Sequence, residues 1–348
     1  MASQIEQYAS NIYEVIKDYR NDDGISITSD SILEWAAQFG EDAEFILYEL
    51  NHLLPKVYFS KEEVKSFLSK VIELFAQKLC GGNLESFLNQ TVFLDMQQDG
   101  KSQKVMLALL DSIVFDKTSK HLSDYELHPD KKNFIYLDDV LASGGTIGNH
   151  LIDWLSSTPE LQNIIEGKKT VYVCLICCHR WGWEFLKYRL ANTVPGFTKN
   201  HMRWCWAYEI QNHLKFNDQS LNIAIPVKDQ PQNVFTYLSS LQADKYEDYA
   251  FREDGSPINE SFFTSAEDRI KYENILLQKG LYIISQVQNP SDNLRPLGLV
   301  NPRYKILGLG THFFTWRNVP NNSPLVFWWS VPGHNWKPLF PPRKSDTI

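Results

Sequence analysis

The stretch that decides the fold is FIYLDDVLASGGTI, residues Phe134–Ile147. Four apolar residues predict a buried strand, Asp138 and Asp139 follow at its carboxyl end, and a turn of small residues opens a helix. Glycines let the backbone approach an anion, and consecutive N–H groups at a helix N-terminus hold a phosphate dianion. The stretch therefore predicts a phosphate site in the glycine turn, where Ser143 and Thr146 add hydroxyl donors. The two carboxylates would accept hydrogen bonds from the hydroxyls of a sugar.

Strand and helix patterns alternate on both sides of this stretch. Strands are predicted at 91–94, 134–137 and 169–178, and helices at 102–110, 147–155 and 183–190. This alternation indicates an α/β fold with a doubly wound, mostly parallel sheet. Ligands of such sheets bind outside the carboxyl ends of the strands, which is where the glycine turn falls. One further helix is predicted at 265–279.

The first 82 residues have a different pattern. Helical apolar stripes fill most of this region, and a short β-like piece at 57–59 interrupts them. We expect a helical, winged-helix-like domain at 1–82. Residues 83–348 are then expected to form the α/β domain, with an aromatic-rich C-terminal extension from about residue 200.

Composition limits the classes of function. The net charge is −8, and residues 1–80 hold fourteen Asp/Glu against seven Lys/Arg. This acidic balance counts against DNA contact by the N-terminal region and favours a protein partner. No apolar run approaches the roughly 20 residues that cross a bilayer, and the N-terminus lacks a secretory pattern. Five cysteines without framework spacing indicate reduced thiols and a cytoplasmic protein.

The stretch from Phe134 to Ile147 resembles the phosphoribosyl-pyrophosphate loop of type I phosphoribosyltransferases. The match lies in the apolar run, the acidic pair and the Ser-Gly-Gly-Thr turn. The resemblance implies that Ala142, Ser143, Gly144, Gly145 and Thr146 bind the 5-phosphate of a phosphoribosyl or nucleotide ligand. It also implies that Asp138 and Asp139 act as the catalytic pair, which binds the ribose hydroxyls or organises Mg²⁺.

Two further loops occupy positions that carry function in those enzymes. Lys101 and Ser102 follow the first strand, where the pyrophosphate loop lies, although an ordinary polar loop has the same composition. A Walker motif is excluded because Asp95 stands where its leading glycine is required. Residues 116–133 occupy the position of the flexible catalytic hood, with Lys117 and His121 available, or form an ordinary surface loop.

The remaining candidates lie further along the chain. Arg180 follows the strand at 169–178 and is expected on the same sheet edge as Asp138. Cys174, Cys177, Cys178 and His179 mimic the spacing of zinc ligands, but Cys174 and Cys177 point to opposite faces of a strand. Buried small hydrophobes are the better interpretation. The aromatic ending is expected to form core, or a hood over a base in which Asn321 and Asn322 read polar edges.

The whole arrangement is similar to the phosphoribosyltransferase-like proteins of bacterial conflict systems. That resemblance rests on Trp35-Ala-Ala-Gln-Phe39, the loop above and the ending Pro320-Asn-Asn-Ser-Pro-Leu-Val-Phe-Trp-Trp329. It implies an anti-phage effector, retron-associated in some cases, that transfers a phosphoribosyl group or breaks down nucleotides. A reverse transcriptase–nucleic acid complex is then a possible partner of the acidic N-terminal region. The order of domains is also similar to the bacterial purine repressor, which leaves open a non-catalytic sensor that binds a partner protein or DNA. A scaffold with a decayed site is a third alternative.

Overall fold

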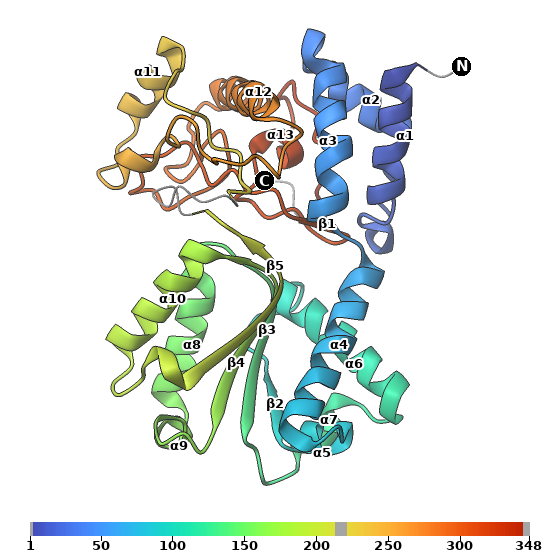
Figure 1. Cartoon of the computed structure of the whole chain (residues 1–348), viewed down its shortest axis with the longest axis vertical. Coiled ribbons are helices and arrows are strands. Elements are labelled where there is room, and N and C mark those ends of the chain that lie inside the picture. The colour runs from blue at the N-terminus through green and yellow to red at the C-terminus, as the bar shows by residue number, and fades with distance from the viewer. Residues whose placement is uncertain (1–2, 213–220, 344–348) are drawn as a thin grey trace. The chain divides into compact units, whose positions relative to one another are not determined.

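The computed structural model describes residues 3–212 and 221–343, and the chain divides into two compact units (Figure 1). The sheet unit consists of residues 62–210, and the aromatic unit combines residues 1–61 with 211–348. Neither boundary coincides with the domain boundary expected at residue 82. The chain thus leaves the aromatic unit once and returns to it after the sheet unit is complete.

A four-stranded parallel sheet forms the centre of the sheet unit. Its strands are β2 (Thr91–Leu94), β3 (Asn133–Leu141), β4 (Thr170–His179) and β5 (Met202–Ile210), in the order β2-β3-β4-β5. The parallel α/β expectation is confirmed. The register places Asp138 beside Leu175, and Leu175 beside Trp206, so these residues share one row across the sheet.

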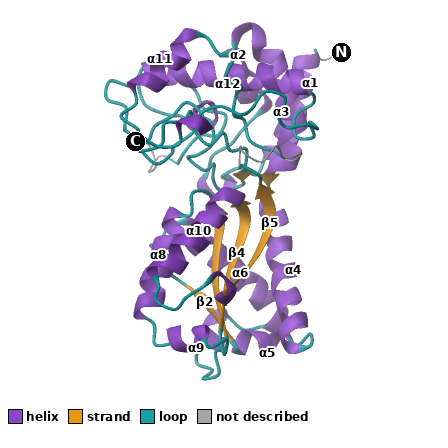
Figure 2. Cartoon of the chain, turned by 60° about the vertical axis from the view of Figure 1, so that its left-hand side comes forward, coloured by secondary structure: helices purple, strands orange, loops and turns teal. Residues whose placement is uncertain are grey.

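Helices cover both faces of this sheet, as Figures 1 and 2 show. On one face, α8 (Gly145–Ser157) and α10 (Arg180–Thr193) pack on Phe134, Tyr136 and Val173 through Leu151, Leu186 and their neighbours. The other face carries α4 (Lys61–Cys80) and α6 (Ser102–Thr118). Shorter helices are α5 (Leu84–Asn89), α7 (Leu122–Glu126) and α9 (Leu161–Ile165). The doubly wound expectation therefore holds.

Helix α4 was expected to close the N-terminal domain, but it belongs to the sheet unit. Its Phe75 ring lies 4.9 Å from the ring of Tyr172 on β4 and 5.8 Å from that of Phe87 on α5. Side chains alternate between the faces of a strand, so Tyr172 points away from the face that Val173 gives to α8 and α10. The apolar stripe of α4 is therefore buried against the second face of the sheet.

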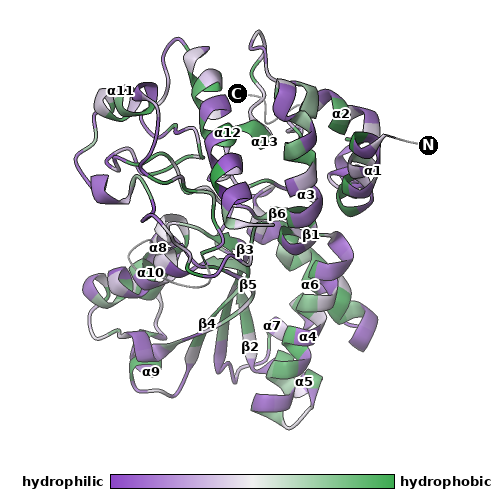
Figure 3. Cartoon of the chain, turned by 45° about the horizontal axis from the view of Figure 1, so that its top comes forward, coloured by the Kyte–Doolittle hydropathy of each residue, from purple (hydrophilic) through white to green (hydrophobic). Residues whose placement is uncertain are grey.

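The aromatic unit is built from two segments that lie far apart in the sequence. The first supplies α1 (Gln4–Ile16), α2 (Ser29–Ala37), α3 (Ala43–Val57) and β1 (Tyr58–Phe59). The second supplies α11 (Gln232–Ser240), α12 (Ala266–Ser285), β6 (Phe314–Thr315) and α13 (Leu325–Trp328). Short 3₁₀ turns lie at Asn21–Asp23, Gly40–Asp42 and Glu247–Tyr249 in this unit, and at Lys199–His201 in the sheet unit. Figure 3 shows hydrophobic and hydrophilic residues alternating along α4 and α12, as expected of helices with one buried side.

Aromatic side chains join the two segments. The rings of Trp35 and Phe327 stack at 5.9 Å, and the Trp35 indole donates a 2.9 Å hydrogen bond to the carbonyl of Val326. The Tyr19 ring meets the Phe340 ring edge-on at 5.0 Å. The aromatic-rich ending is therefore core that buries the N-terminal helices, and not an extension of the sheet unit. Of the two interpretations in the sequence analysis, core is the one that the structure supports.

The winged-helix expectation is not confirmed. Strand β1 pairs in parallel with β6, Tyr58 beside Phe314 and Phe59 beside Thr315. A wing is an antiparallel hairpin made by neighbouring segments, whereas this pair joins residues more than two hundred and fifty positions apart. The described residues 3–61 thus contain helices that resemble the expected domain but no wing.

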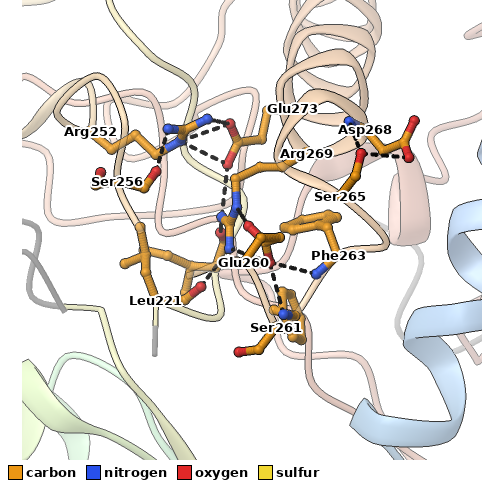
Figure 4. A network of polar contacts seen from close by, with 12 residues as sticks. Leu221, Arg252, Ser256, Glu260, Ser261, Phe263, Ser265, Asp268, Arg269 and Glu273 are labelled. Carbon is orange, nitrogen blue, oxygen red and sulfur yellow. Dashed lines mark hydrogen bonds and ion pairs between the residues drawn. The ribbon is translucent and has the colours of Figure 1, made fainter. Parts of the chain in front are cut away.

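A buried ionic network fixes the loops of the aromatic unit on α12 (Figure 4). The carboxylate of Glu273 lies 3.0 Å from a guanidinium nitrogen of Arg252 and 3.1 Å from one of Arg269. Arg269 also pairs with Glu260 and donates a 2.6 Å hydrogen bond to the carbonyl of Leu221. Burial raises the pKa of Glu273, and the two guanidinium groups oppose that effect. Buried charges of this kind persist only when fully paired, so the network holds three segments in one arrangement.

Among the described helices, none is both long enough and apolar enough to cross a bilayer.

Candidate functional site

The glycine turn joins β3 to α8 and rests on α10. Gly144 has a φ of +74°, a left-handed conformation that favours glycine. A Cβ added at Gly144 would lie 2.7 Å from the carbonyl oxygen of Gly182, and one added at Gly182 would lie 1.9 Å from that of Ala142. The backbones of the turn and of α10 therefore touch at two glycines. Sequence reasoning missed Gly182, although a glycine between two tryptophans inside a helix is a signal of close packing.

Backbone amides of the turn are available to a ligand. The Gly145 amide lies 3.4 Å from the hydroxyl of Ser143. Within the described part of the chain, the amides of Ser143, Gly144, Thr146 and Ile147 have no protein acceptor. The side chains of Ser143 and Thr146 are exposed. Because α8 starts here, the partial positive charge of its N-terminus adds to these donors.

Asp138 lies near the carboxyl end of β3, and its side chain points into the protein. The side chain is 3% exposed, and both carboxylate oxygens are already hydrogen-bonded. One oxygen accepts from the Ser102 hydroxyl at 2.5 Å and the Asp139 amide at 2.9 Å. The other accepts from the side-chain amide of Gln97 at 2.7 Å and the Tyr136 hydroxyl at 3.4 Å. Burial raises the pKa of Asp138, and these four hydrogen bonds oppose that effect.

Asp139 points to the opposite face of β3 because successive side chains of a strand alternate. It is 4% exposed, and its carboxylate accepts a 2.7 Å hydrogen bond from the Val140 amide. The structure therefore brings the two aspartates to one strand end without bringing their carboxylates to one ligand.

The loop after β2 is held against Asp138 by side chains that sequence reasoning missed. Gln103 accepts hydrogen bonds from the amides of Met96 at 2.6 Å and Gln97 at 3.0 Å. Ser102, a candidate pyrophosphate contact, instead donates to Asp138. Lys101 is exposed at the start of α6 and remains open to a ligand. Glutamine side chains carry no local periodicity, so only the fold shows this connection.

The candidate hood residues lie away from Asp138. Helix α6 begins with Ser102 beside Asp138, and Lys117 follows fifteen residues later, about 22 Å along the helix at 1.5 Å per residue. There Lys117 pairs with Glu73 at 2.6 Å, and His121 lies 2.8 Å from Asp111. The expected loop at 116–133 is partly helical, with the end of α6 and all of α7. These side chains stabilise the far end of the sheet unit.

Arg180 and the two asparagines have separate positions. Arg180 is the first residue of α10, directly after β4 and therefore at the carboxyl edge of the sheet, where its guanidinium lies 3.7 Å from Glu209. Asn321 and Asn322 belong to the aromatic unit. The carbonyl of Asn321 accepts from the Leu299 amide at 2.8 Å, and that of Asn322 from the Thr311 amide at 3.4 Å.

The cysteines fit the interpretation as buried small residues. Cys174, Cys177 and Cys178 are buried in β4, and burial raises the pKa of the Cys177 thiol. Cys174 lies beside Cys205 of β5 in the sheet register, and their mutual hydrogen bond and burial raise the pKa of the Cys174 thiol.

The residues at the strand end do not form a direct Mg²⁺ site. The protein already occupies both oxygens of Asp138, and the carboxylate of Asp139 faces away from it. No group of three His, Cys, Asp or Glu side chains within residues 3–212 and 221–343 is arranged to hold a metal. We therefore assign no step to a protein-bound ion, and the Mg²⁺ that the resemblance implies stays a prediction.

A family model described as PRTase-CE matches residues 32–342, which is most of the chain. No curated protein matches the chain.

Proposed function

Because the chain belongs to the PRTase-CE family, a phosphoribosyltransferase-type family, we propose that the turn Ala142–Thr146 binds the 5-phosphate of a phosphoribosyl group. The observation that carries the proposal is the set of four backbone amides without a protein acceptor at the N-terminus of α8. The first amides of an α-helix have no acceptor within the helix, so this cluster is free to pair with an anion or with water. The hydroxyls of Ser143 and Thr146 lie beside these amides in the sequence and extend the donor set.

The proposed reaction class is transfer at the ribose carbon C1. The bond from C1 to its leaving group, pyrophosphate or a base, breaks with the electron pair leaving on that group, and a bond to an acceptor forms. Positive charge develops on the ribose ring in between, and nearby carboxylates stabilise such charge. In this chain Asp139 stays a candidate for that role, while Asp138 positions the strand end through its four hydrogen bonds.

The finer expectations rest on the resemblance of the sequence. By that resemblance we expect an effector of anti-phage defence that acts on nucleotides. The alternative is a sensor that binds a partner protein or DNA. An acidic balance in residues 1–80 supports a protein partner over DNA for either role.

Calorimetry tests the phosphate site. We would titrate ribose 5-phosphate, ribose and inorganic phosphate into the wild type, Thr146→Val and Ser143→Ala. The matched control is Ser156→Ala, because Ser156 is an exposed serine at the other end of α8. Each lost hydroxyl donor to a charged phosphate costs about 1.5–3 kcal/mol, so affinity for ribose 5-phosphate should fall roughly 10- to 150-fold.

The outcomes separate a ribose 5-phosphate site from a general anion site. Ribose should not bind, and inorganic phosphate should bind more weakly than ribose 5-phosphate. Equal binding of the two phosphates would mean that the ribose is not recognised. Failure of the wild type to bind either phosphate would contradict the proposal.

A further inference from the structure

The two edges of the sheet differ in how they are protected. Strand β2 forms one edge and is only four residues long. The ammonium group of Lys131 donates to the carbonyls of Asn89 at 3.0 Å and Thr91 at 3.1 Å, beside the start of this strand. Short strands and lysine side chains are two ways in which proteins prevent edge-to-edge pairing. This edge is therefore closed to another strand.

Strand β5 forms the other edge and lacks these features. It has nine residues, Met-Arg-Trp-Cys-Trp-Ala-Tyr-Glu-Ile, with no proline and no lysine. Within the described ranges, no segment other than β4 pairs with the backbone between Arg203 and Ala207. Trp204 is 51% exposed and stacks on Trp206, with ring centroids 4.0 Å apart. A long, aromatic edge of this kind is a template for a further strand.

The sequence of β5 is complementary to itself when the strand runs antiparallel to a second copy. A two-fold axis at Trp206, the middle residue, pairs all nine residues of both strands. It sets Arg203 opposite Glu209 of the second copy, and Trp204 opposite Tyr208 of the second copy. Opposite charges and aromatic pairs at directly opposite positions are the pairs that stabilise antiparallel strands.

Both charged side chains are at least partly exposed. Arg203 is exposed, and its guanidinium donates to the carbonyls of Asn200 at 2.6 Å and of its neighbour Met202 at 3.2 Å. The Glu209 side chain is 38% exposed and lies 3.7 Å from Arg180, so a second guanidinium would join an existing charge pair. Moving the axis to the next residue on either side would remove both Arg–Glu pairs.

We propose that β5 is a homodimer interface, in which two copies of this chain join their sheets through antiparallel β5 strands about a two-fold axis at Trp206. Each contact then occurs twice, as in any isologous interface. One strand pair buries less surface than a standard interface, so the dimer should be weak, with a Kd of about tens of micromolar. The proposal does not depend on the function of the phosphate site.

Analytical ultracentrifugation of the full chain across protein concentrations tests the interface. Arg203→Glu puts two Glu–Glu pairs in the dimer and should raise Kd at least about tenfold. Glu209→Arg puts two Arg–Arg pairs there, with the same effect. Lys199→Glu is the control, because it makes the same charge change at an exposed lysine just before β5 and should leave Kd within about twofold.

Mixing the two variants makes the test independent of their individual folding. Arg203→Glu with Glu209→Arg forms a heterodimer in which both pairs are attractive again, so the mixture should associate with nearly the wild-type Kd. A loss caused by misfolding would not be rescued by mixing. A wild type that stays monomeric at several hundred micromolar would overturn the proposal, and so would a mixture that stays monomeric.

Discussion

Replacing Gly182 by alanine tests how strongly α10 supports the phosphate turn. Gly182 lies inside a helix, where alanine is normally favoured over glycine by about 0.8–1 kcal/mol. The added Cβ would, however, lie 1.9 Å from the carbonyl oxygen of Ala142 and 2.8 Å from a methyl carbon of Leu141. The first contact is with backbone, which cannot rotate away. We expect overpacking to outweigh helix propensity, with a net loss of about 1–3 kcal/mol in the sheet unit.

Gly148→Ala in α8 is the matched control. Its Cβ would lie 2.8 Å from the guanidinium of Arg189, the far end of a flexible side chain that can move. We expect a free energy of unfolding within about 1 kcal/mol of wild type, or above it. The two substitutions are chemically identical, and only the neighbour of the new methyl group differs.

Cysteine labelling measures this effect in the sheet unit alone, because all five cysteines lie in residues 62–210. The buried thiols of Cys177 and Cys178 react only when the unit opens, so their labelling rate reports its opening free energy. Gly182→Ala should label about 5- to 150-fold faster than wild type and should lose affinity for ribose 5-phosphate. Labelling no faster than in Gly148→Ala, with binding intact, would refute the reasoning.

Three further predictions concern buried polar groups. Ser102→Ala removes one hydrogen-bond donor from the buried carboxylate of Asp138 and should lower the free energy of unfolding of the sheet unit by about 1–3 kcal/mol. Its control in the same helix, Ser112→Ala, should lower it by under about 0.5 kcal/mol in the same labelling assay. Burial lowers the pKa of His179 to about 3, so the neutral ring stabilises the sheet unit fully above pH 6.5. Below that pH the free energy of unfolding should fall by about 1.4 kcal/mol per pH unit, because the unfolded chain binds a proton that the folded chain does not. His179→Gln should remove this slope, as measured by hydrogen exchange of β4 peptides between pH 6.5 and 4.5. Arg269→Met should destabilise the aromatic unit by about 3–5 kcal/mol, as measured by hydrogen exchange of α12 peptides. Arg303→Met, at an exposed arginine that pairs with Asp244, should leave that exchange nearly unchanged.

Local patterns predicted the centre of the fold. The apolar runs at 91–94, 134–137 and 169–178 correspond to β2, β3 and β4, and the structure extends β3 to Leu141. The strand at 202–210 was missed because Arg203 and Glu209 shorten its apolar run. An edge strand needs only one buried side along part of its length, so its sequence signal is weak.

Long-range contacts explain most of what the sequence could not show. The glycine turn was located, but the contact of Gly182 with it depends on how α10 crosses the sheet end. Gln103 holds the loop after β2 through hydrogen bonds that leave no periodic trace. The two compact units differ from the expected domains for the same reason: Trp35 stacks on Phe327, and no local pattern links residues so far apart.

The two-segment construction of the aromatic unit has a consequence for synthesis of the chain on the ribosome. Trp35 stacks on Phe327, and at about 5–20 residues per second the second emerges roughly 15–60 s after the first. The sheet unit, whose segment is continuous, can fold during that interval. During the same interval, the apolar sides of helices α1–α3 that later contact the C-terminal segment stay exposed. A nascent chain halted between residues 210 and 320 would therefore carry a complete sheet unit and an unburied, aggregation-prone N-terminal segment.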